Sequence, residues 1–219
     1  MAETSRRRYR ITFAKTEAMR FTGHLDLHRT WERTFRRAAL PLAYSEGFNP
    51  QPKINIGAAL PLGCVSEADL IDVLLETEVD PLEVESSLRR AAPPGIRIEQ
   101  VVLVEPGEPV LQRQVRAALF EVAVADHAQP DDIGRRIESL IGAEHLPRVR
   151  RGKSYDLRPL IEEIRFDRAA SKLWIRLTAR AGATGRPDEV LDALGLDPTA
   201  RLIRRTGLVL SQPQEPTPR

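Results

Sequence analysis

The chain has 219 residues, of which 42% are hydrophobic and 29% charged, and its 33 lysines and arginines nearly balance its 31 aspartates and glutamates. This is the composition of an ordinary globular protein with a sizeable core, and so small a net charge does not by itself indicate a nucleic-acid-binding protein. The single cysteine, Cys64, excludes an internal disulfide and favours a reducing compartment. We find no secretory signal and no run of about 18 apolar residues, so we expect a cytoplasmic protein that does not enter a membrane.

The first half of the chain alternates between strand and helix patterns. Apolar residues recur at every second position in the predicted strands and at every third or fourth position in the predicted helices. The strands are expected at residues 9–15, 54–58, 70–75 and 96–104, and the helices at residues 24–38 and 81–92. Pro81 stands at a helix start, where its missing N–H costs least. This order, βαββαβ, is that of a ferredoxin-like unit with two helices on one face of an antiparallel sheet.

The same order recurs, less regularly, after a connector at residues 105–109. Strands are expected at residues 115–124, 160–166, 173–178 and 202–210, and helices at residues 131–141 and 187–194. We therefore predict an α+β protein built from tandem ferredoxin-like (βαββαβ) units with helices packed on one face of each sheet. The first unit spans residues 8–106, the second spans residues 112–211, and the Pro-rich residues 212–219 form a disordered tail.

The first predicted helix carries a row of arginines opposite its apolar side. Arg29, Arg33, Arg36 and Arg37 share one face, which Glu32 interrupts. The planar guanidinium suits phosphate groups, so the row is a candidate RNA-binding surface. Most charged helical faces are only solvated, and that interpretation stays open.

His24 and His28 stand four residues apart on the same helix. Two imidazoles at this spacing can share a metal ion, but no third ligand follows from the sequence. The pair can also act as general acid and base, because histidine titrates near neutral pH. A structural role at the helix start is the third interpretation, with Asp26 close to the positive end of the helix dipole.

The loop at residues 44–53 contains two aromatic residues among turn-forming glycine and prolines. Tyr44 and Phe48, with Asn49 and Lys53 nearby, form a candidate surface for stacking bases and contacting phosphates. Alternatively, Phe48 fills the core while the prolines shape the turn.

A second basic cluster surrounds Gly152. It consists of Arg148, Arg150, Arg151 and Lys153, and Arg158 follows in the segment DLRP. A glycine among cations is typical of a phosphate-binding loop, although a solvated hairpin explains the same pattern. The sequence has no Walker motif, no strand-anchored GxGxxG and no GxSxG nucleophile motif.

The stretch RFTGHLDLHRTWERTFRRAALPLAYSEGFNPQPKINIGAALPLG, residues 20–63, is the most distinctive part of the chain. It resembles the signature of the radical SAM-linked family of unknown function, whose members are encoded beside, or fused to, an uncharacterised radical SAM protein. The similarity extends from about Tyr9 to Leu210, with a looser match at Lys153–Pro159. Gln51 stands where that family usually has histidine.

The resemblance implies a radical SAM protein as partner. That partner would hold the iron–sulfur cluster and S-adenosylmethionine, because a cluster needs several thiolates and this chain has only Cys64. No metal site is assigned to this chain.

We expect a non-catalytic substrate-binding or adaptor module, with RNA as its ligand. At fold level the arrangement is also similar to CRISPR repeat-processing RAMP endonucleases. A metal-independent ribonuclease using His24, His28 and Lys53 is therefore one alternative, and a protein-interaction domain is another.

Overall fold

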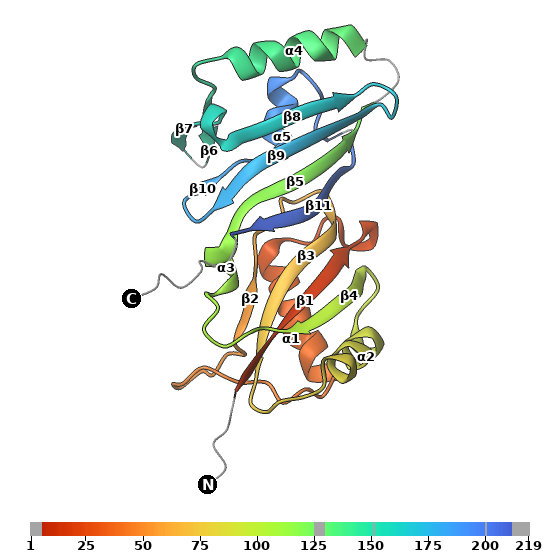
Figure 1. The fold of residues 1–219 in the computed structure, drawn as a ribbon, viewed down its shortest axis with the longest axis vertical. Helices are drawn as coiled ribbons and strands as arrows, with labels where there is room; N and C mark the ends of the chain where they lie inside the picture. The colour runs from red at the N-terminus through yellow and green to blue at the C-terminus, as the bar shows by residue number, and fades with distance from the viewer. Residues whose placement is uncertain (1–5, 125–129, 151, 200, 212–219) are drawn as a thin grey trace, which may run out of the picture.

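The computed structural model describes residues 6–124, 130–150, 152–199 and 201–211. It confirms the predicted α+β class, with a large, mostly antiparallel sheet and helices packed against it (Figure 1). The predicted disordered tail, residues 212–219, lies outside the described residues. No helix in the described ranges is long and apolar enough to cross a membrane.

The described elements include strands of very different length. The strands are β1 Arg7–Lys15, β2 Ile54–Ile56, β3 Cys64–Leu75, β4 Ile96–Leu103, β5 Val115–Ala123, β6 Pro147–Arg150, β7 Lys153–Asp156, β8 Ile161–Asp167, β9 Lys172–Arg180, β10 Ala183–Thr184 and β11 Ile203–Leu210. The α-helices are α1 His24–Arg37, α2 Pro81–Ala91, α3 Leu111–Gln114, α4 Pro130–Gly142 and α5 Pro187–Ala193, and short 3₁₀ turns occupy Glu17–Met19 and Arg158–Leu160.

Nine of the described strands form one continuous sheet. Its order is β10-β9-β5-β11-β3-β1-β4, with β2 also paired to β3 and β8 also paired to β9. All pairs are antiparallel except β11–β3, where Ile203–Arg205 runs parallel to Cys64–Ser66. The remaining strands, β6 and β7, form a separate hairpin.

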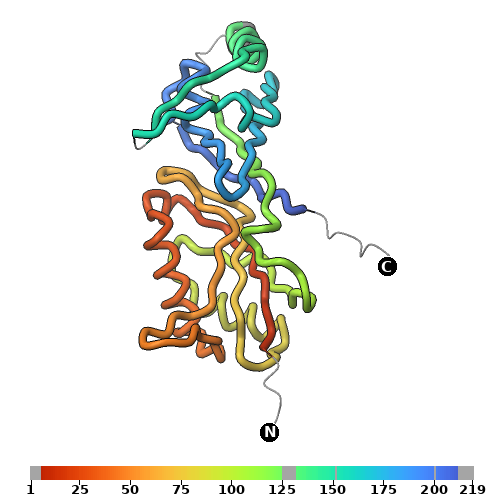
Figure 2. The backbone as a smooth tube through the Cα atoms, turned by 90° about the vertical axis from the view of Figure 1, so that its left-hand side faces the viewer, coloured from red at the N-terminus to blue at the C-terminus, as the bar shows by residue number. Residues whose placement is uncertain are grey.

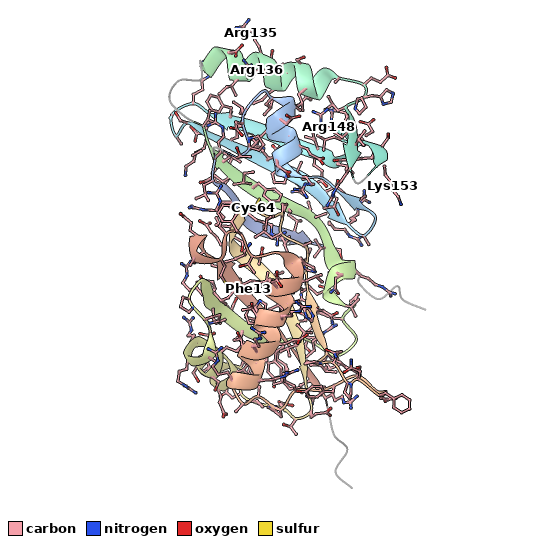
Figure 3. All side chains as sticks on the ribbon, turned by 180° about the vertical axis from the view of Figure 1, so that it is seen from behind. Phe13, Cys64, Arg135, Arg136, Arg148 and Lys153 are labelled. Carbon is pink, nitrogen blue, oxygen red and sulfur yellow. The ribbon has the colours of Figure 1, made fainter. Side chains whose placement is uncertain are left out.

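Two apolar cores lie along this sheet, one in each half of the chain. In the first half, Trp31 and Phe35 of α1 pack with Phe13 of β1, and Leu88 of α2 joins the same cluster. In the second half, α4 and α5 cover β5 and β9. Figures 1 and 3 show α1 and α5 on the same face of the sheet. The division into units at residues 8–106 and 112–211 stays a prediction.

Helix α2 begins at Pro81, as the sequence predicts. Pro81 is the first helical residue, and the Asp80 carboxylate accepts a hydrogen bond from the Leu82 N–H at 2.9 Å. This satisfies one of the amide groups that a helix start leaves without a partner.

The predicted strand at residues 70–75 is wrong in its start, because β3 begins six residues earlier, at Cys64. The missed part contains Ser66 and Asp69, which are polar and yet fully buried. Such residues break the alternating apolar pattern by which a strand is predicted. They are buried because their partners come from β1 and from β11.

A buried ion pair joins the two halves of the sheet. Arg205 of β11 donates from Nε to Asp69 Oδ1 at 2.6 Å and from Nη2 to Asp69 Oδ2 at 2.7 Å. Its other hydrogen bonds go to the carbonyls of Ala58 and Ala59, and the arginine and aspartate are each only 1% exposed. Every donor of this guanidinium group therefore faces protein rather than water.

We predict that Arg205→Met lowers the free energy of unfolding by about 3–5 kcal/mol, because it leaves the Asp69 carboxylate buried without a partner. Urea denaturation measures this change. Arg204→Ala is the matched control, since the neighbouring Arg204–Glu67 pair is exposed and is expected to cost about 1 kcal/mol or less. The double variant Arg205→Met/Asp69→Leu should recover much of the loss. Equal losses in Arg205→Met and Arg204→Ala would contradict the role of the buried pair.

Candidate functional site

The arginine row of α1 is exposed along one side of the helix. Leu27, Trp31 and Phe35 are buried, while Arg29, Arg33 and Arg36 face outward. Arg29 lies 3.5 Å from Asp26. Within the described ranges, no side-chain hydrogen bond or ion pair involves Arg33 or Arg36, nor the neighbouring Arg37. These three guanidinium groups are thus available to an anion.

Within the described residues Glu32 forms no ion pair with this row, because its carboxylate contacts a histidine instead. Glu32 Oε1 lies 3.1 Å from His28 Nδ1, one helical turn away. The acidic residue that interrupts the row in the sequence is therefore half-buried beside a histidine.

The positive surface continues from α1 onto α2. A groove of about 220 Å³ separates the C-terminal ends of the two helices, and Arg37, Arg90 and Ser87 line it. Arg90 Nη2 donates to Ser87 Oγ at 3.1 Å, which orients this guanidinium along the groove wall. We call the surface formed by Arg33, Arg36, Arg37 and Arg90 the basic face. Its arginines also stand in or near the last turns of their helices, where positive charge is favourable to the helix dipole.

Residues 44–53 form a projecting tongue held together at its base. Ser45 N donates to Gln51 O at 2.9 Å, and Tyr44 forms a β-bridge with Pro52. Phe48, near the tip, is 112% exposed, so it does not fill the core. Tyr44 is also exposed, and Asn49 accepts a hydrogen bond from the Gln51 amide at 3.4 Å.

The residues of the ribonuclease alternative lie at two ends of the first half. His24 comes two residues after Thr22, whose carbonyl accepts from Lys15 Nζ at 3.1 Å, and Lys15 pairs with Ser66 near the start of β3. The carbonyl of Lys53 instead accepts from Leu74 N at 3.0 Å, at the other end of β3. Eight strand residues separate those two positions, roughly 26 Å at about 3.3 Å per residue. The fold does not bring Lys53 to the histidines.

The junction of the two halves contains charged residues that sequence reasoning missed. Lys15 is fully buried, and its ammonium donates to the carbonyls of Arg20, Thr22 and Cys64 at 3.1–3.3 Å. Burial lowers the pKa of Lys15. Arg20 donates to Gly63 O at 2.8 Å and to Arg201 O at 2.9 Å, which ties the signature stretch to the second half. The only sign of this burial in the sequence is that a lysine ends a strand whose residues otherwise alternate between apolar and polar.

Cys64 is a buried residue at the same junction. Burial is the main cause that raises the pKa of its thiol to about 11. The thiolate is therefore scarce near neutral pH, and Cys64 is poorly suited to act as a nucleophile. Among the residues described, no group of three or more His, Cys, Asp or Glu side chains is placed to hold a metal ion.

Three exposed apolar side chains gather near this junction. Phe21 is 74% exposed, Leu25 in the first turn of α1 is 72% exposed, and Leu62 is 63% exposed. Phe21 and Leu62 line the same pocket of about 230 Å³, which also reaches Asp188 and Pro198 of the second half. We call Phe21, Leu25 and Leu62 the apolar patch. All three belong to the signature stretch.

The second basic cluster lies on the β6–β7 hairpin. Arg148 pairs with Tyr155 and Arg150 pairs with Lys153, so these four side chains share one face of the hairpin. Gly152 takes a positive φ of 76° at the turn, which favours glycine. Arg151 lies outside the described residues.

Arg158 is engaged in holding the fold. Its Nε donates to Ile141 O at the end of α4 at 2.9 Å, and its Nη1 donates to Ile161 O at 3.3 Å. The neighbouring Asp156 accepts from Leu146 N at 2.8 Å and from Arg158 N at 3.0 Å, and it lies 2.8 Å from His145 Nδ1. The DLRP segment therefore organises the base of the hairpin.

The predicted ligand-binding residues do not form a single site. Figures 1 and 2 place the tongue and the β6–β7 hairpin along the same edge of the molecule but at opposite ends of its long axis. Arg148 and Lys153 project from the upper part of the molecule in Figure 3, which views the helix-covered face. The structure thus offers two separate cationic regions.

The chain belongs to a family described as an uncharacterized protein conserved in bacteria (DUF2344), whose model matches residues 8–187. No curated protein matches it. Among solved structures it is similar to the acetolactate synthase small subunit from Thermotoga maritima, with 12% identity over 96% of this chain and 98% of that chain. The TM-score of that match is 0.28, which supports no inference about fold or function.

We predict that Asp156→Asn destabilises the protein near neutral pH but has little effect near pH 2. The hydrogen bond with His145, and then those from Leu146 N and Arg158 N, lower the pKa of Asp156 to about 2 from an ordinary value of 3.8. The carboxylate therefore stabilises the fold fully above about pH 4, and this contribution is lost as the pH falls toward 2.

Urea denaturation of the native protein and of Asp156→Asn, in steps of about 1 pH unit between pH 6 and pH 2, measures the difference between their free energies of unfolding. His145→Gln removes the largest cause of the lowered pKa of Asp156. The free energy of unfolding of this variant should therefore fall less between pH 6 and pH 2 than that of the native protein. A difference between native protein and Asp156→Asn that stays constant over this range would refute the assignment.

Proposed function

We propose that this protein is a non-catalytic, RNA-binding adaptor that acts together with a separate radical SAM enzyme. The observation that carries the RNA part is the basic face. Arg33, Arg36 and Arg37 are exposed on one side of α1 and have no side-chain partner within the described ranges, and Arg90 extends the surface across a groove. Unpaired guanidinium groups in a row match the repeated phosphates of a nucleic-acid backbone.

The tongue supplies the second component of such a surface. It follows α1 directly in the chain and presents Phe48 and Tyr44 to solvent beside Lys53. Exposed aromatic rings next to cations stack unpaired bases without demanding a particular sequence. This combination favours single-stranded RNA over a folded duplex, whose bases are already stacked.

We predict that the triple variant Arg33→Ala/Arg36→Ala/Arg37→Ala binds single-stranded RNA at least ~10-fold more weakly at low salt. Each lost phosphate contact should also reduce the slope of log K against log salt by about 0.7, so the slope should fall by roughly 2. Fluorescence anisotropy with a labelled oligonucleotide of about 12 nucleotides measures both quantities. Phe48→Ala should weaken binding while leaving the salt slope unchanged, since stacking releases no counterions.

The control is a second triple variant, Arg97→Ala/Arg113→Ala/Arg165→Ala, which removes the same charge from exposed positions elsewhere. If this control lowers affinity as much as the first variant, binding reflects net charge and not the basic face. The assay is run in chelator with gel analysis of the RNA. Defined fragments would favour the ribonuclease alternative instead.

The proposed partner is a radical SAM protein, and the apolar patch supports a protein partner at the junction. Phe21 and Leu62 border one pocket, and Leu25 comes four residues after Phe21, so their exposed side chains are not scattered singly over the surface. In this proposal the partner, and not this chain, carries the iron–sulfur cluster and S-adenosylmethionine.

We predict that Phe21→Ser/Leu25→Ser/Leu62→Ser abolishes co-purification with the tagged radical SAM protein of the same bacterium but preserves RNA binding. Loss of the apolar contacts should weaken the interface by more than ~10-fold, since buried apolar anchors dominate such interfaces. The samples are treated with nuclease, so that RNA cannot bridge the two proteins. Leu82→Ser/Val149→Ser, at two other exposed apolar positions, should have no effect. Capture that persists in the triple variant would reject the patch as the docking surface.

We further infer that the chain consists of two ferredoxin-like units. The order β4-β1-β3-β2 with α1 and α2, and the order β11-β5-β9-β8 with α4 and α5, support this division. We also propose a cytoplasmic location, which the free, buried Cys64 supports.

A further inference from the structure

A pocket beside the second basic cluster lies at the opposite end of the molecule from the basic face. Its volume is about 520 Å³, which is in the usual range of small-molecule sites, about 300–1,000 Å³. The inner face of the β6–β7 hairpin forms one wall, through Arg150, Lys153 and Tyr155. The opposite lining is Leu160 with the β9–β10 turn at Gly182–Thr184.

The two cations of this wall lack partners. Within the described ranges, neither Arg150 nor Lys153 takes part in a side-chain hydrogen bond or ion pair, although the charge of Arg150 acts on Glu189 of α5. The acidic residue that lines the pocket, Asp156, already binds His145 and two backbone amides. The pocket lining therefore carries two unpartnered cations against one carboxylate, and the two cations come from paired positions on adjacent strands.

Tyr155 fixes the hairpin to the second half at this wall. Its ring packs against the second core, and its hydroxyl is buried and has no hydrogen-bond partner among the described residues. Tyr155 follows Lys153 on the same face of β7, so this packing holds the two cations at the pocket.

We propose that this pocket binds one phosphorylated nucleoside, with Arg150 and Lys153 contacting its phosphate. A phosphomonoester carries close to two negative charges at neutral pH and three acceptor oxygens, which match two unpartnered cations. Leu160, Gly182 and Ala183 offer an apolar surface for a flat base. The ligand is either a free nucleoside monophosphate or the phosphorylated end of an RNA chain, since both present the same chemistry.

This inference goes beyond the RNA surface proposed above, because it depends on other residues at the other end of the molecule. Isothermal titration calorimetry of the full chain tests it with adenosine, guanosine, cytidine and uridine monophosphates. We expect at least one of them to bind at least ~10-fold more tightly than inorganic phosphate or its own nucleoside. Arg150→Ala and Lys153→Ala should each weaken binding by ~10-fold or more, whereas Tyr155→Phe, which removes only a buried hydroxyl, should leave binding unchanged.

Two controls separate this pocket from the basic face. Arg165→Ala removes an exposed arginine of the second half that is outside the pocket, and it should leave nucleotide binding unchanged. The triple variant Arg33→Ala/Arg36→Ala/Arg37→Ala should do the same, so failure of the RNA proposal would not imply failure of this one. Circular dichroism verifies that Tyr155→Phe and the hairpin variants remain folded.

Short oligonucleotides distinguish the two sources of the ligand. Tighter binding of a 5′-phosphorylated oligonucleotide than of its 5′-hydroxyl counterpart would assign the pocket to an RNA end. Binding of the monophosphate alone would assign it to a free nucleotide. The proposal is overturned if no monophosphate binds at ~1 mM, if inorganic phosphate binds equally well, or if Arg150→Ala and Lys153→Ala leave affinity unchanged.

Discussion

The pairing of Arg205 with Asp69 is the interaction on which the continuous sheet depends. β11 is the last of the described strands, yet it inserts between β5 and β3 and runs parallel to the start of β3. Burying an arginine and an aspartate is costly unless each finds its partner in good geometry, and here two short parallel hydrogen bonds provide it. A shifted register would leave both charges unpaired, so the pair selects one alignment of the two halves.

Near that pair, the signature stretch both stabilises the fold and presents side chains to solvent. The ammonium of Lys15 binds the carbonyls of Arg20 and Thr22, while the guanidinium of Arg20 binds carbonyls in both halves. These contacts fix the backbone immediately before α1, and with it the exposed positions of Phe21 and Leu25. The same short segment therefore stabilises the junction from within and presents apolar side chains outward.

The elements with a clear period could be predicted from the sequence, whereas the contacts between distant segments could not. The spacing of Leu27, Trp31 and Phe35 predicts α1, and Pro81 marks the start of α2. Nothing local in Cys64–Ser66 indicates that Ile203–Arg205 lies beside it, because a parallel pairing depends on the whole arrangement. Full burial of Lys15 and Arg205 is equally unexpected, since charged side chains are seldom buried without partners from remote segments. The basic residues of the candidate sites could be identified from the sequence, but only the fold shows that they lie in two separate regions.

In the proposed adaptor, the geometry of α1 keeps the two partner surfaces apart. Leu25 lies in its first turn and Arg33, the first arginine of the basic face, comes eight residues later, so roughly 12 Å of helix separate the apolar patch from the basic face. That distance exceeds the Debye length of about 8 Å at physiological salt, so the charge of bound RNA is largely screened at the patch. A protein docked on the patch would cover the junction and leave the C-terminal ends of α1 and α2 open. The helix, anchored by Trp31 and Phe35 in the core, would then hold the two proposed partners at a fixed separation, which is the physical requirement for an adaptor that presents a substrate to an enzyme.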